Sequence, residues 1–247
     1  MQMVKRFIPA SLKLWYAVNK RRSRDFLNGN DKKFAIQGCA QNDLLPAFTI
    51  KQPVKSNVST VNKVHNLGLA IQKLNDTLIA PGHLFSFWQM VGNPSQKNGY
   101  KKSRSIVGNN LQEEVGGGLC QLSGLIYFLA LHAGLTITER HAHSLDIYKE
   151  EERFTPLGSD ATVAFGYKDL RLLNPYSFPV CFSFQLTPEL LTGTIFAREK
   201  ITACTIEFEY NKNRTETKVT TISKTNGNAV VIAQDSYGLN QAEKALE

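Results

Sequence analysis

The chain has 247 residues, of which 42% are hydrophobic and 20% are charged. This composition is typical of a globular domain with a sizeable core and excludes a disordered or low-complexity protein. The net charge of +8 is concentrated in residues 1–33, which hold nine Lys and Arg residues and two acidic residues. Because the rest of the chain is nearly neutral and carries no recognised nucleic-acid-binding module, we expect no nucleic-acid partner.

The four cysteines lie far apart and form no CxxC pair. This spacing does not indicate a disulfide framework, so we expect free thiols in a reducing compartment. The first residues show no secretory signal, and the longest apolar run, 122–135, is too short to cross a bilayer. The sequence therefore predicts a cytoplasmic protein. The cysteines are Cys39, Cys120, Cys181 and Cys204.

Residues 1–50 are expected to form a basic N-terminal arm with a helix after Pro9. In that helix Trp15 and Val18 share a face, and arginines follow. A basic helix that carries tryptophan can lie on anionic lipid, which would give residues 1–33 a peripheral contact with the inner face of the membrane. The alternative is a solvated extension that packs Trp15 against the body. Both interpretations stay open at this point.

Residues 51–200 are expected to form a core domain with two helices. Apolar residues at steps of three and four predict a helix from about Thr60 to Leu78, before Pro81. A second helix is predicted from Cys120 to about residue 133. An α+β fold follows, with two early helices packed on a mostly antiparallel sheet and with 201–247 as a β-rich C-terminal extension. Strands are expected at 83–88, 135–147, 161–167, 178–186, 192–197, 203–210, 215–222 and 228–233.

Three glycines, Gly116, Gly117 and Gly118, lead directly into the second helix at Leu119 and Cys120. Without a Cβ, glycine lets backbone N–H groups approach a ligand, and the start of a helix carries a positive dipole. Both effects favour a thiolate at Cys120 with a lowered pKa, and the N–H groups can hold an oxyanion. A lone cysteine in a helix is usually a small buried hydrophobe, but the glycines before it and three ionisable residues on one face of the strand that follows favour a reactive site, so both interpretations stay open.

The expected strand over 135–147 supplies partners for a thiol. At a period of two, Glu139, His141 and His143 share one face, and Arg140, Ser144 and Asp146 share the other. A nucleophilic thiol needs a base within hydrogen-bond reach. A helix that begins near Cys120 and is followed by a strand bearing histidine resembles the arrangement in papain-like and transglutaminase-like enzymes.

The same residues allow two other chemistries and one structural interpretation. His141 and His143 can bind Zn²⁺ together with Glu139 or Cys120. They can also be a hydrogen-bonded structural pair. Glu139, Asp160 and Asp169 can provide an acid and a base for glycoside cleavage, although Asp169 can simply pair with Arg171 at the surface. The spacing alone does not decide among them.

Three stretches carry a recognisable pattern: "NKVHNLGLAIQKLNDTLIAPGHLFSFWQMVGNPSQKNGY", "GGGLCQLSGLIYFLALHAGLTITERHAHSLD" and "PLGSDATVAFGYKDLRLLN". Over residues 60–200 this pattern resembles the VanW family, bacterial proteins named from vancomycin B-type resistance clusters. The resemblance implies a link to glycopeptide resistance and the cell envelope. Because family members vary at the position of Asp160, the resemblance favours Asp169 as a third catalytic residue. The motif positions that it carries over are Gly116, Gly117, Gly118, Cys120, Gln121, Glu139, Arg140, His141, His143, Ser144, Asp169 and Arg171.

Residues and resemblance together predict a cysteine-dependent hydrolase or acyl transferase acting on a peptidoglycan-related peptide or precursor. Cys120 would be the nucleophile, and His141 or His143 the base. Asp169 or Glu139 would orient that base. The glycines and Gln121 would stabilise the oxyanion, and no metal or cofactor is expected. The remaining binding residues are Arg140, Ser144 and Arg171.

Two alternatives remain beside this hypothesis. One is a non-catalytic module that binds a wall precursor or an envelope protein, and the other is a carboxylate-dependent enzyme that cleaves glycans. Whether the chain is an enzyme at all stays open.

Overall fold

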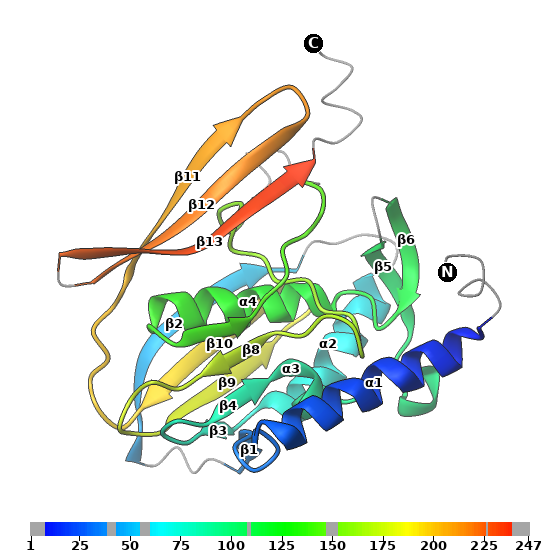
Figure 1. Cartoon of the computed structure of the whole chain (residues 1–247), viewed down its shortest axis with the longest axis horizontal. Helices are drawn as coiled ribbons and strands as arrows, with labels where there is room; N and C mark the ends of the chain where they lie inside the picture. The colour runs from blue at the N-terminus through cyan, green and yellow to red at the C-terminus, as the bar shows by residue number, and fades with distance from the viewer. Residues whose placement is uncertain are drawn as a thin grey trace.

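The computed structural model describes residues 8–38, 43–54, 60–107, 110–146, 153–225 and 227–238. Cys39 and the acidic run 150–152 lie outside the described residues. The predicted α+β class is confirmed, since helices before residue 133 are combined with antiparallel strands that dominate the C-terminal part (Figure 1). The helices are α1 (Ala10–Leu27), α2 (Thr60–Leu74), α3 (Phe87–Val91) and α4 (Leu119–His132).

The largest sheet has the strand order β1-β3-β9-β10-β2, and all its neighbours are antiparallel. Its strands are β1 (Ile36–Gln37), β2 (Leu45–Pro53), β3 (Thr77–Ile79), β9 (Val180–Leu186) and β10 (Leu190–Ala197). The expected boundary after residue 50 falls inside β2, so the end of the expected arm belongs to the core sheet.

Two smaller sheets and a hairpin complete the fold. The sheet β4-β8-β7 carries the site described below, and the sheet β11-β12-β13 projects from the core (Figure 1). Their strands are β4 (Leu84–Ser86), β7 (Thr136–Glu139), β8 (Arg171–Leu173), β11 (Thr205–Lys212), β12 (Glu216–Thr225) and β13 (Asn228–Gly238). The hairpin strands are β5 (Lys102–Val107) and β6 (Asn110–Val115).

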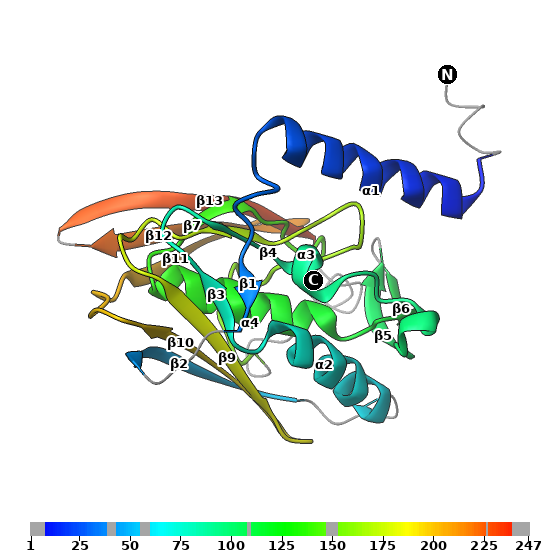
Figure 2. The ribbon, with the colours of Figure 1, turned by 90° about the horizontal axis from the view of Figure 1, so that it is seen from below.

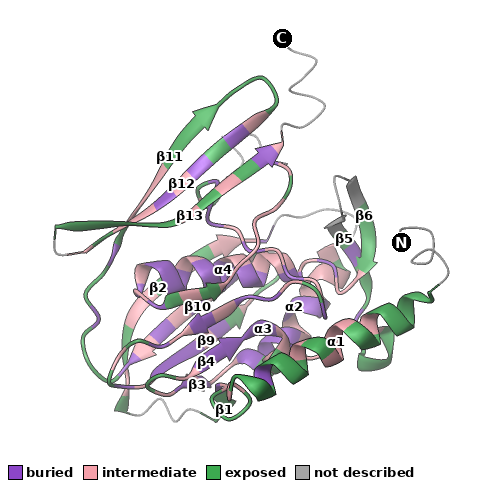
Figure 3. Ribbon diagram, viewed as in Figure 1, coloured by how far each residue is buried: buried purple, intermediate pink, exposed green. Residues whose placement is uncertain are grey.

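Helix α4 is the centre of the core. It lies between the five-stranded sheet and the sheet β4-β8-β7, and it touches β2, β10 and β7 (Figure 2). A helix covered on opposite sides needs apolar residues around most of its circumference. That explains why its buried residues, coloured purple in Figure 3, do not follow a single stripe. They are Leu119, Leu122, Ser123, Leu125, Ile126, Tyr127, Leu129, Ala130 and Leu131.

Several predicted boundaries were wrong for local reasons. Helix α2 ends at Leu74, because the Thr77 hydroxyl donates to the Leu74 carbonyl at 2.6 Å and the chain turns into β3. The strand expected at 83–88 stops at Ser86, whose hydroxyl caps α3 by accepting from the Gln89 N–H at 3.1 Å. Residues 161–167 form no strand, because they end in a turn at Gly166 with φ of +82°.

Helix α1 packs on the body through one stripe of side chains. A Cβ built on Gly166 would lie 2.8 Å from Leu14 Cδ1 and 3.2 Å from Val18 Cγ2, so this glycine lets the helix approach closely. Trp15 is 62% exposed, and the interpretation that packs it against the body is wrong. Among the described helices, none is long and apolar enough to span a membrane.

Gly193, under α4, and Gly68, in open space on α2, provide a test of the packing of α4 on the sheet and its control. A Cβ on Gly193 of β10 would lie 2.8 Å from Leu129 Cδ1 and 3.0 Å from Leu125 Cδ2, both on α4. Gly193→Ala is therefore expected to lower the free energy of unfolding by about 1–3 kcal/mol. Gly68→Ala in α2 meets open space and is expected to raise it by about 0.5–1 kcal/mol. Urea denaturation measures both, and equal effects would contradict this account of the packing.

Candidate functional site

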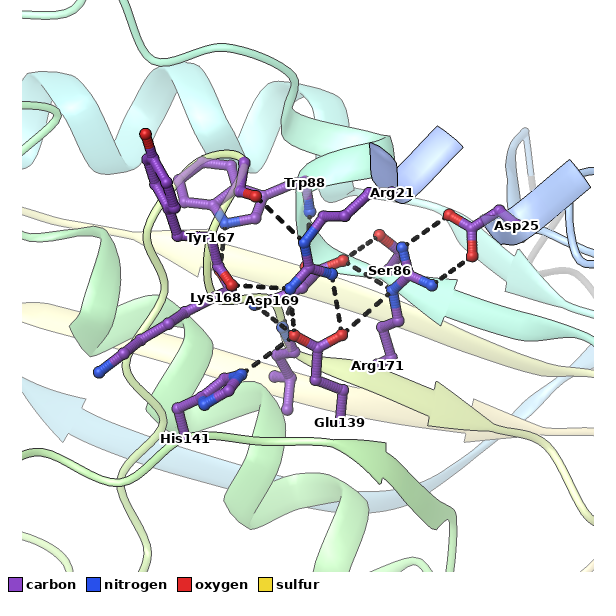
Figure 4. Close-up of polar contacts among 12 residues, drawn as sticks. Arg21, Asp25, Ser86, Trp88, Glu139, His141, Tyr167, Lys168, Asp169 and Arg171 are labelled. Atoms are coloured by element: carbon purple, nitrogen blue, oxygen red, sulfur yellow. Dashed lines mark hydrogen bonds and ion pairs between the residues drawn. The ribbon is translucent and has the colours of Figure 1, made fainter. Parts of the chain in front are cut away.

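Five charged side chains from three segments form what we call the ionic cluster: Arg21, Asp25, Glu139, Asp169 and Arg171 (Figure 4). Glu139 ends β7 and pairs in register with Arg171 of β8. Arg21 of α1 donates two hydrogen bonds to the Glu139 carboxylate, at 2.9 and 2.5 Å. Arg171 donates two to Asp25 of α1, at 2.6 and 2.8 Å. Helix α1 is thus held by two ion pairs, in one of which it supplies the cation and in the other the anion.

Glu139 is the most contacted carboxylate of the ionic cluster. Besides Arg21, it accepts the Asp169 backbone N–H at 3.0 Å and lies 3.0 Å from His141 Nε2. Burial opposes its ionisation, but the hydrogen bonds from Arg21 and His141 hold the pKa of Glu139 at about 2. Glu139 is therefore an anion at neutral pH, with its oxygens already engaged.

Asp169 is buried, with 2% of its surface exposed. It accepts hydrogen bonds from the Ser86 hydroxyl at 2.6 Å, the Trp88 N–H at 3.1 Å and Arg171 Nε at 3.0 Å. Burial raises the pKa of Asp169, and these donors act against that rise. The pair with Arg171 exists, but it lies in the interior and not at the surface as one interpretation expected. Asp169 joins the start of α3 to the start of β8.

Arg140, next to Glu139, points into a second network. Its guanidinium donates to the Asp160 carbonyl at 2.7 Å, to the Gly158 carbonyl at 3.0 Å and to the Tyr237 hydroxyl at 3.1 Å. It also forms an ion pair with Asp235. Both Asp235 and Tyr237 belong to β13, so Arg140 fastens the C-terminal sheet to the core. We call this set the Arg140 network.

Asp160 and His143 complete the Arg140 network. The Asp160 carboxylate accepts from the Tyr237 hydroxyl at 2.5 Å and from the His143 backbone N–H at 2.7 Å. Burial opposes ionisation, but His143 and Arg140 hold the pKa of Asp160 below its ordinary value. The His143 ring bonds through Nδ1 to Thr162, and burial lowers the pKa of this histidine.

The two histidines do not share a face. Strand β7 ends at Glu139, after a bulge between Ile137 and Glu139, and residues 140–146 belong to no strand. The predicted strand over 135–147 is therefore wrong beyond Glu139. Once the two-residue period is lost, His141 turns toward Glu139 and His143 toward Thr162. In the described part of the chain, no three or more His, Cys, Asp or Glu side chains gather as a metal ion would require.

The three glycines before α4 have packing roles. A Cβ on Gly117 would lie 2.1 Å from the Ser103 carbonyl oxygen, and Gly118 has φ of +96°. The N–H groups of Gly116 and Gly117 donate to the Lys101 carbonyl at 3.1 Å and the Glu114 carbonyl at 3.0 Å. These two donors are therefore used within the fold, contrary to their expected role in holding an oxyanion.

Cys120 lies against the core beside the segment that carries Val163. Its Sγ is 3.8 Å from the Val163 carbonyl oxygen, and burial raises the pKa of the thiol. The expected lowering of this pKa is wrong, because burial disfavours the thiolate. Neither His141 nor His143 forms a hydrogen bond with Cys120 among the residues described.

The other predicted binding residues are dispersed. Gln121 donates through Nε2 to the Pro53 carbonyl at 2.9 Å, toward the end of β2. The Ser144 carbonyl accepts from the Gly238 N–H at 3.0 Å, next to the end of β13. The structure thus brings together Glu139, His141, Asp169 and Arg171, and separately Arg140 and His143.

A cavity of about 350 Å³ opens beside the ionic cluster, and we call it the β7–β8 pocket. Its wall combines charged and polar groups from the turn after α1 with residues of β4, β7 and β8. This mixture offers a ligand both polar and apolar contacts. The lining residues are Asn30, Lys33, Gly82, Leu84, Thr138, Glu139, Arg171 and Leu173.

Residues 62–196, more than half of the chain, match the family described as VanW like protein. The chain belongs to this family. The matched region contains Cys120 and the sheet β4-β8-β7, whereas α1 and β11–β13 lie outside it. It also contains the following members of the ionic cluster and the Arg140 network: Glu139, Asp169, Arg171, Arg140, His143 and Asp160. The resemblance carried by the glycine–cysteine block and the ERHxHS stretch is thereby confirmed.

Two curated relatives are similar to this VanW-like chain. The vancomycin B-type resistance protein VanW of Enterococcus faecalis is 36% identical over 136 residues, which are 55% of this chain and 50% of that protein. The uncharacterized protein YoaR of Bacillus subtilis is 36% identical over 124 residues, 50% of this chain and 39% of that protein. The matched part thus spans half or less of each relative's length. No solved structure matches the chain.

Sequence reasoning missed the partners that come from outside the family region. Arg21 and Asp25 counted only toward the charge of the arm, although they continue the stripe of Leu14 and Val18 at helical spacing. That continuation marks them as facing the body and was the available signal. Tyr237 lies 77 residues from Asp160, and nothing local announces their contact.

Replacing Glu139 tests the ionic cluster through the pH dependence of stability. The pKa of Glu139 falls from 4.5 in the unfolded chain to about 2 in the folded protein. The ionised carboxylate therefore stabilises the folded protein fully above pH 4.5, and this contribution is lost as the pH falls through 2. Glu139→Gln is expected to lower the free energy of unfolding at pH 7 by about 2–3 kcal/mol, with the difference shrinking toward pH 2. Thermal denaturation across pH measures it.

The matched control for that experiment is Glu207→Gln, which removes an exposed pair with Lys224. Because exposed pairs contribute about 0–1 kcal/mol, this variant is expected to behave like the parent protein. A Glu139→Gln deficit that stays constant from pH 7 to pH 2 would contradict the account of the ionic cluster.

Alkylation tests the state of Cys120. Because burial raises its pKa, iodoacetamide is expected to label Cys120 in the folded protein with a midpoint above the value of about 8.5 for a free thiol. His141→Ala and His143→Ala are each expected to leave the labelling midpoint unchanged. Mass spectrometry of the Cys120 peptide gives the midpoint, and urea-unfolded protein is the reference. A midpoint below 8.5 that rises in one histidine variant would restore a thiol–imidazole pair.

Proposed function

We propose that this VanW-like chain is a non-catalytic binding module of the cell envelope, connected with glycopeptide resistance, that takes a peptidoglycan-related peptide in the β7–β8 pocket. The observation that carries the proposal is the use of the motif's charges. Glu139 and Arg171 are engaged with α1 and line a pocket of mixed polarity, whereas Arg140 is engaged in the Arg140 network. Among the described residues, none of the three forms a hydrogen bond with Cys120. The connection with glycopeptide resistance rests on the similarity to the vancomycin B-type resistance protein VanW.

The thiol mechanism has less support. A cysteine nucleophile needs a base within hydrogen-bond reach and a depressed pKa. The partner of Cys120 is a carbonyl oxygen, and its pKa is raised. The carboxylate mechanism has less support as well, because Asp169 is buried and both Glu139 and Asp169 are saturated with hydrogen-bond donors.

The pocket fits a peptide that carries both signs of charge. Lys33 presents a cation at its wall and Asn30 an amide, while Glu139 and Arg171, although paired with Arg21 and Asp25, set a negative and a positive potential beside them. A peptidoglycan stem peptide has free carboxylates and, at its diamino acid, an amine. Charge complementarity of this kind fixes the orientation of a bound ligand and excludes ligands of a single charge.

Calorimetric titration with a disaccharide–pentapeptide muropeptide tests the proposal. We expect saturable binding to the intact chain and no new product by mass spectrometry. Lys33→Ala is expected to weaken binding about tenfold, which corresponds to about 1.4 kcal/mol. Lys32→Ala removes the neighbouring charge, which does not line the pocket, and is the matched control. Cys120→Ala is expected to bind like the parent protein.

Two outcomes would overturn the binding-module proposal. One is cleavage or acyl transfer on the muropeptide by the parent protein that Cys120→Ala abolishes, which would make the chain a thiol enzyme. The other is muropeptide binding that Lys32→Ala and Lys33→Ala weaken equally, which would reduce the contact to nonspecific attraction by a basic loop.

A further inference from the structure

Helix α1 exposes large apolar side chains to solvent. Trp15, Tyr16, Phe26 and Leu27 are 62%, 63%, 69% and 81% exposed, and Leu12 is 51% exposed. We call these five residues the outer face of α1. Leu12, Trp15 and Tyr16 lie toward the start of the helix, and Phe26 and Leu27 lie at its end. Large exposed side chains gathered on one side of an element mark an interaction surface in a folded protein. In Figure 3 the helix is coloured mainly as exposed along its length.

The outer face cannot turn inward, because the opposite face of α1 is fixed to the body. Leu14 and Val18 pack on Gly166, and Arg21 and Asp25 are paired with Glu139 and Arg171. With 100° between successive residues, the outer-face residues fall on the opposite side of the helix from this stripe. Figure 2 shows α1 lying along the outside of the molecule.

Basic residues border the outer face and give it one sign of charge. Lys13, Lys20, Arg22 and Arg24 are all exposed. The acidic residue of α1, Asp25, is buried in its pair with Arg171 and does not offset them. Apolar and aromatic side chains flanked by exposed cations form the pattern of a helix that lies in the interface of an anionic bilayer.

We propose that the outer face of α1 binds the surface of an anionic lipid bilayer, with the helix lying in the plane of the membrane. Its 18 residues make a rod about 27 Å long, which suits an interfacial position. Trp15 and Tyr16 are the residue types that favour the headgroup region. A second copy of the chain is a poorer occupant, because it would bring the same four cations against each other.

This contact would also orient the rest of the molecule. Residues Asn30 and Lys33 of the β7–β8 pocket follow α1 directly in the chain. Since α1 is held to Glu139 and Arg171, a membrane-bound α1 would keep the pocket close to the lipid surface. The inference rests on the exposed helix face alone and does not depend on what the pocket binds.

Vesicle binding of the full chain tests the inference. Phosphatidylcholine vesicles with phosphatidylglycerol are compared with pure phosphatidylcholine vesicles by co-sedimentation and by tryptophan fluorescence. We expect partitioning into the anionic vesicles, a blue shift of the emission and weaker binding at high salt. The double variant Trp15→Ser/Phe26→Ser is expected to lose at least tenfold in partition coefficient. The matched control Val230→Ser/Val231→Ser removes exposed apolar residues from β13 and is expected to bind like the parent protein.

A second variant separates lipid binding from any loss of folding. Lys13→Gln/Lys20→Gln leaves the outer face intact and is expected to reduce binding to anionic vesicles at least fivefold, with circular dichroism unchanged. Equal binding to neutral and anionic vesicles, or outer-face variants that bind like the parent protein, would overturn the inference. Sedimentation that reveals dimers lost in Trp15→Ser/Phe26→Ser, without vesicle binding by the parent, would assign the face to a second copy and also overturn it.

Discussion

Two adjacent charges at the end of β7, Glu139 and Arg140, hold the peripheral parts of the molecule onto its core. Glu139 points to one side and receives α1 through Arg21, whereas Arg140 points to the other and receives β13 through Asp235 and Tyr237. Arg140 is nearly buried, with 4% of its side chain exposed. Because an unpaired buried charge costs about 3–5 kcal/mol, Arg140 requires the partners that the fold supplies. The end of one short strand therefore determines where both outer elements sit.

Sequence periodicity predicted well the elements that bury one regular face or are bounded by clear turn residues. Helix α2 has one apolar stripe, and the strands from β9 to β13 alternate or are separated by clear turn residues. The strand predicted over 135–147 failed because its alternation of residue types continues past the point where the backbone leaves the sheet. Residues 140–146 are held by Asp160, Thr162 and Gly238, which are distant in sequence, and no local pattern reports such contacts.

The candidate site was predictable residue by residue but not as an assembly. The motif positions of the family were found one by one, and Glu139, His141, Asp169 and Arg171 do meet. Cys120 was expected at the same place with a lowered pKa, since a helix start and three glycines favour a thiolate. Its burial beside Val163 reverses that direction, and burial depends on how the segment after Asp160 folds back on α4. Gly117 is required by the close approach of the Ser103 carbonyl, and its neighbours pack against Pro94 and Lys63.

The pairing of α1 with the ionic cluster also bears on what an isolated VanW-like region would be. The family match begins at residue 62, yet the countercharges of Glu139 and Arg171 come from Arg21 and Asp25. Cut to its family boundaries, this chain would keep the pair of Arg171 with Asp169 and the contact of Glu139 with His141, but it would lose the two ion pairs with α1. Such a surface would lack two of its ion-pair partners. It would then bind another helix that presents a cation and an anion four residues apart, as Arg21 and Asp25 do on α1.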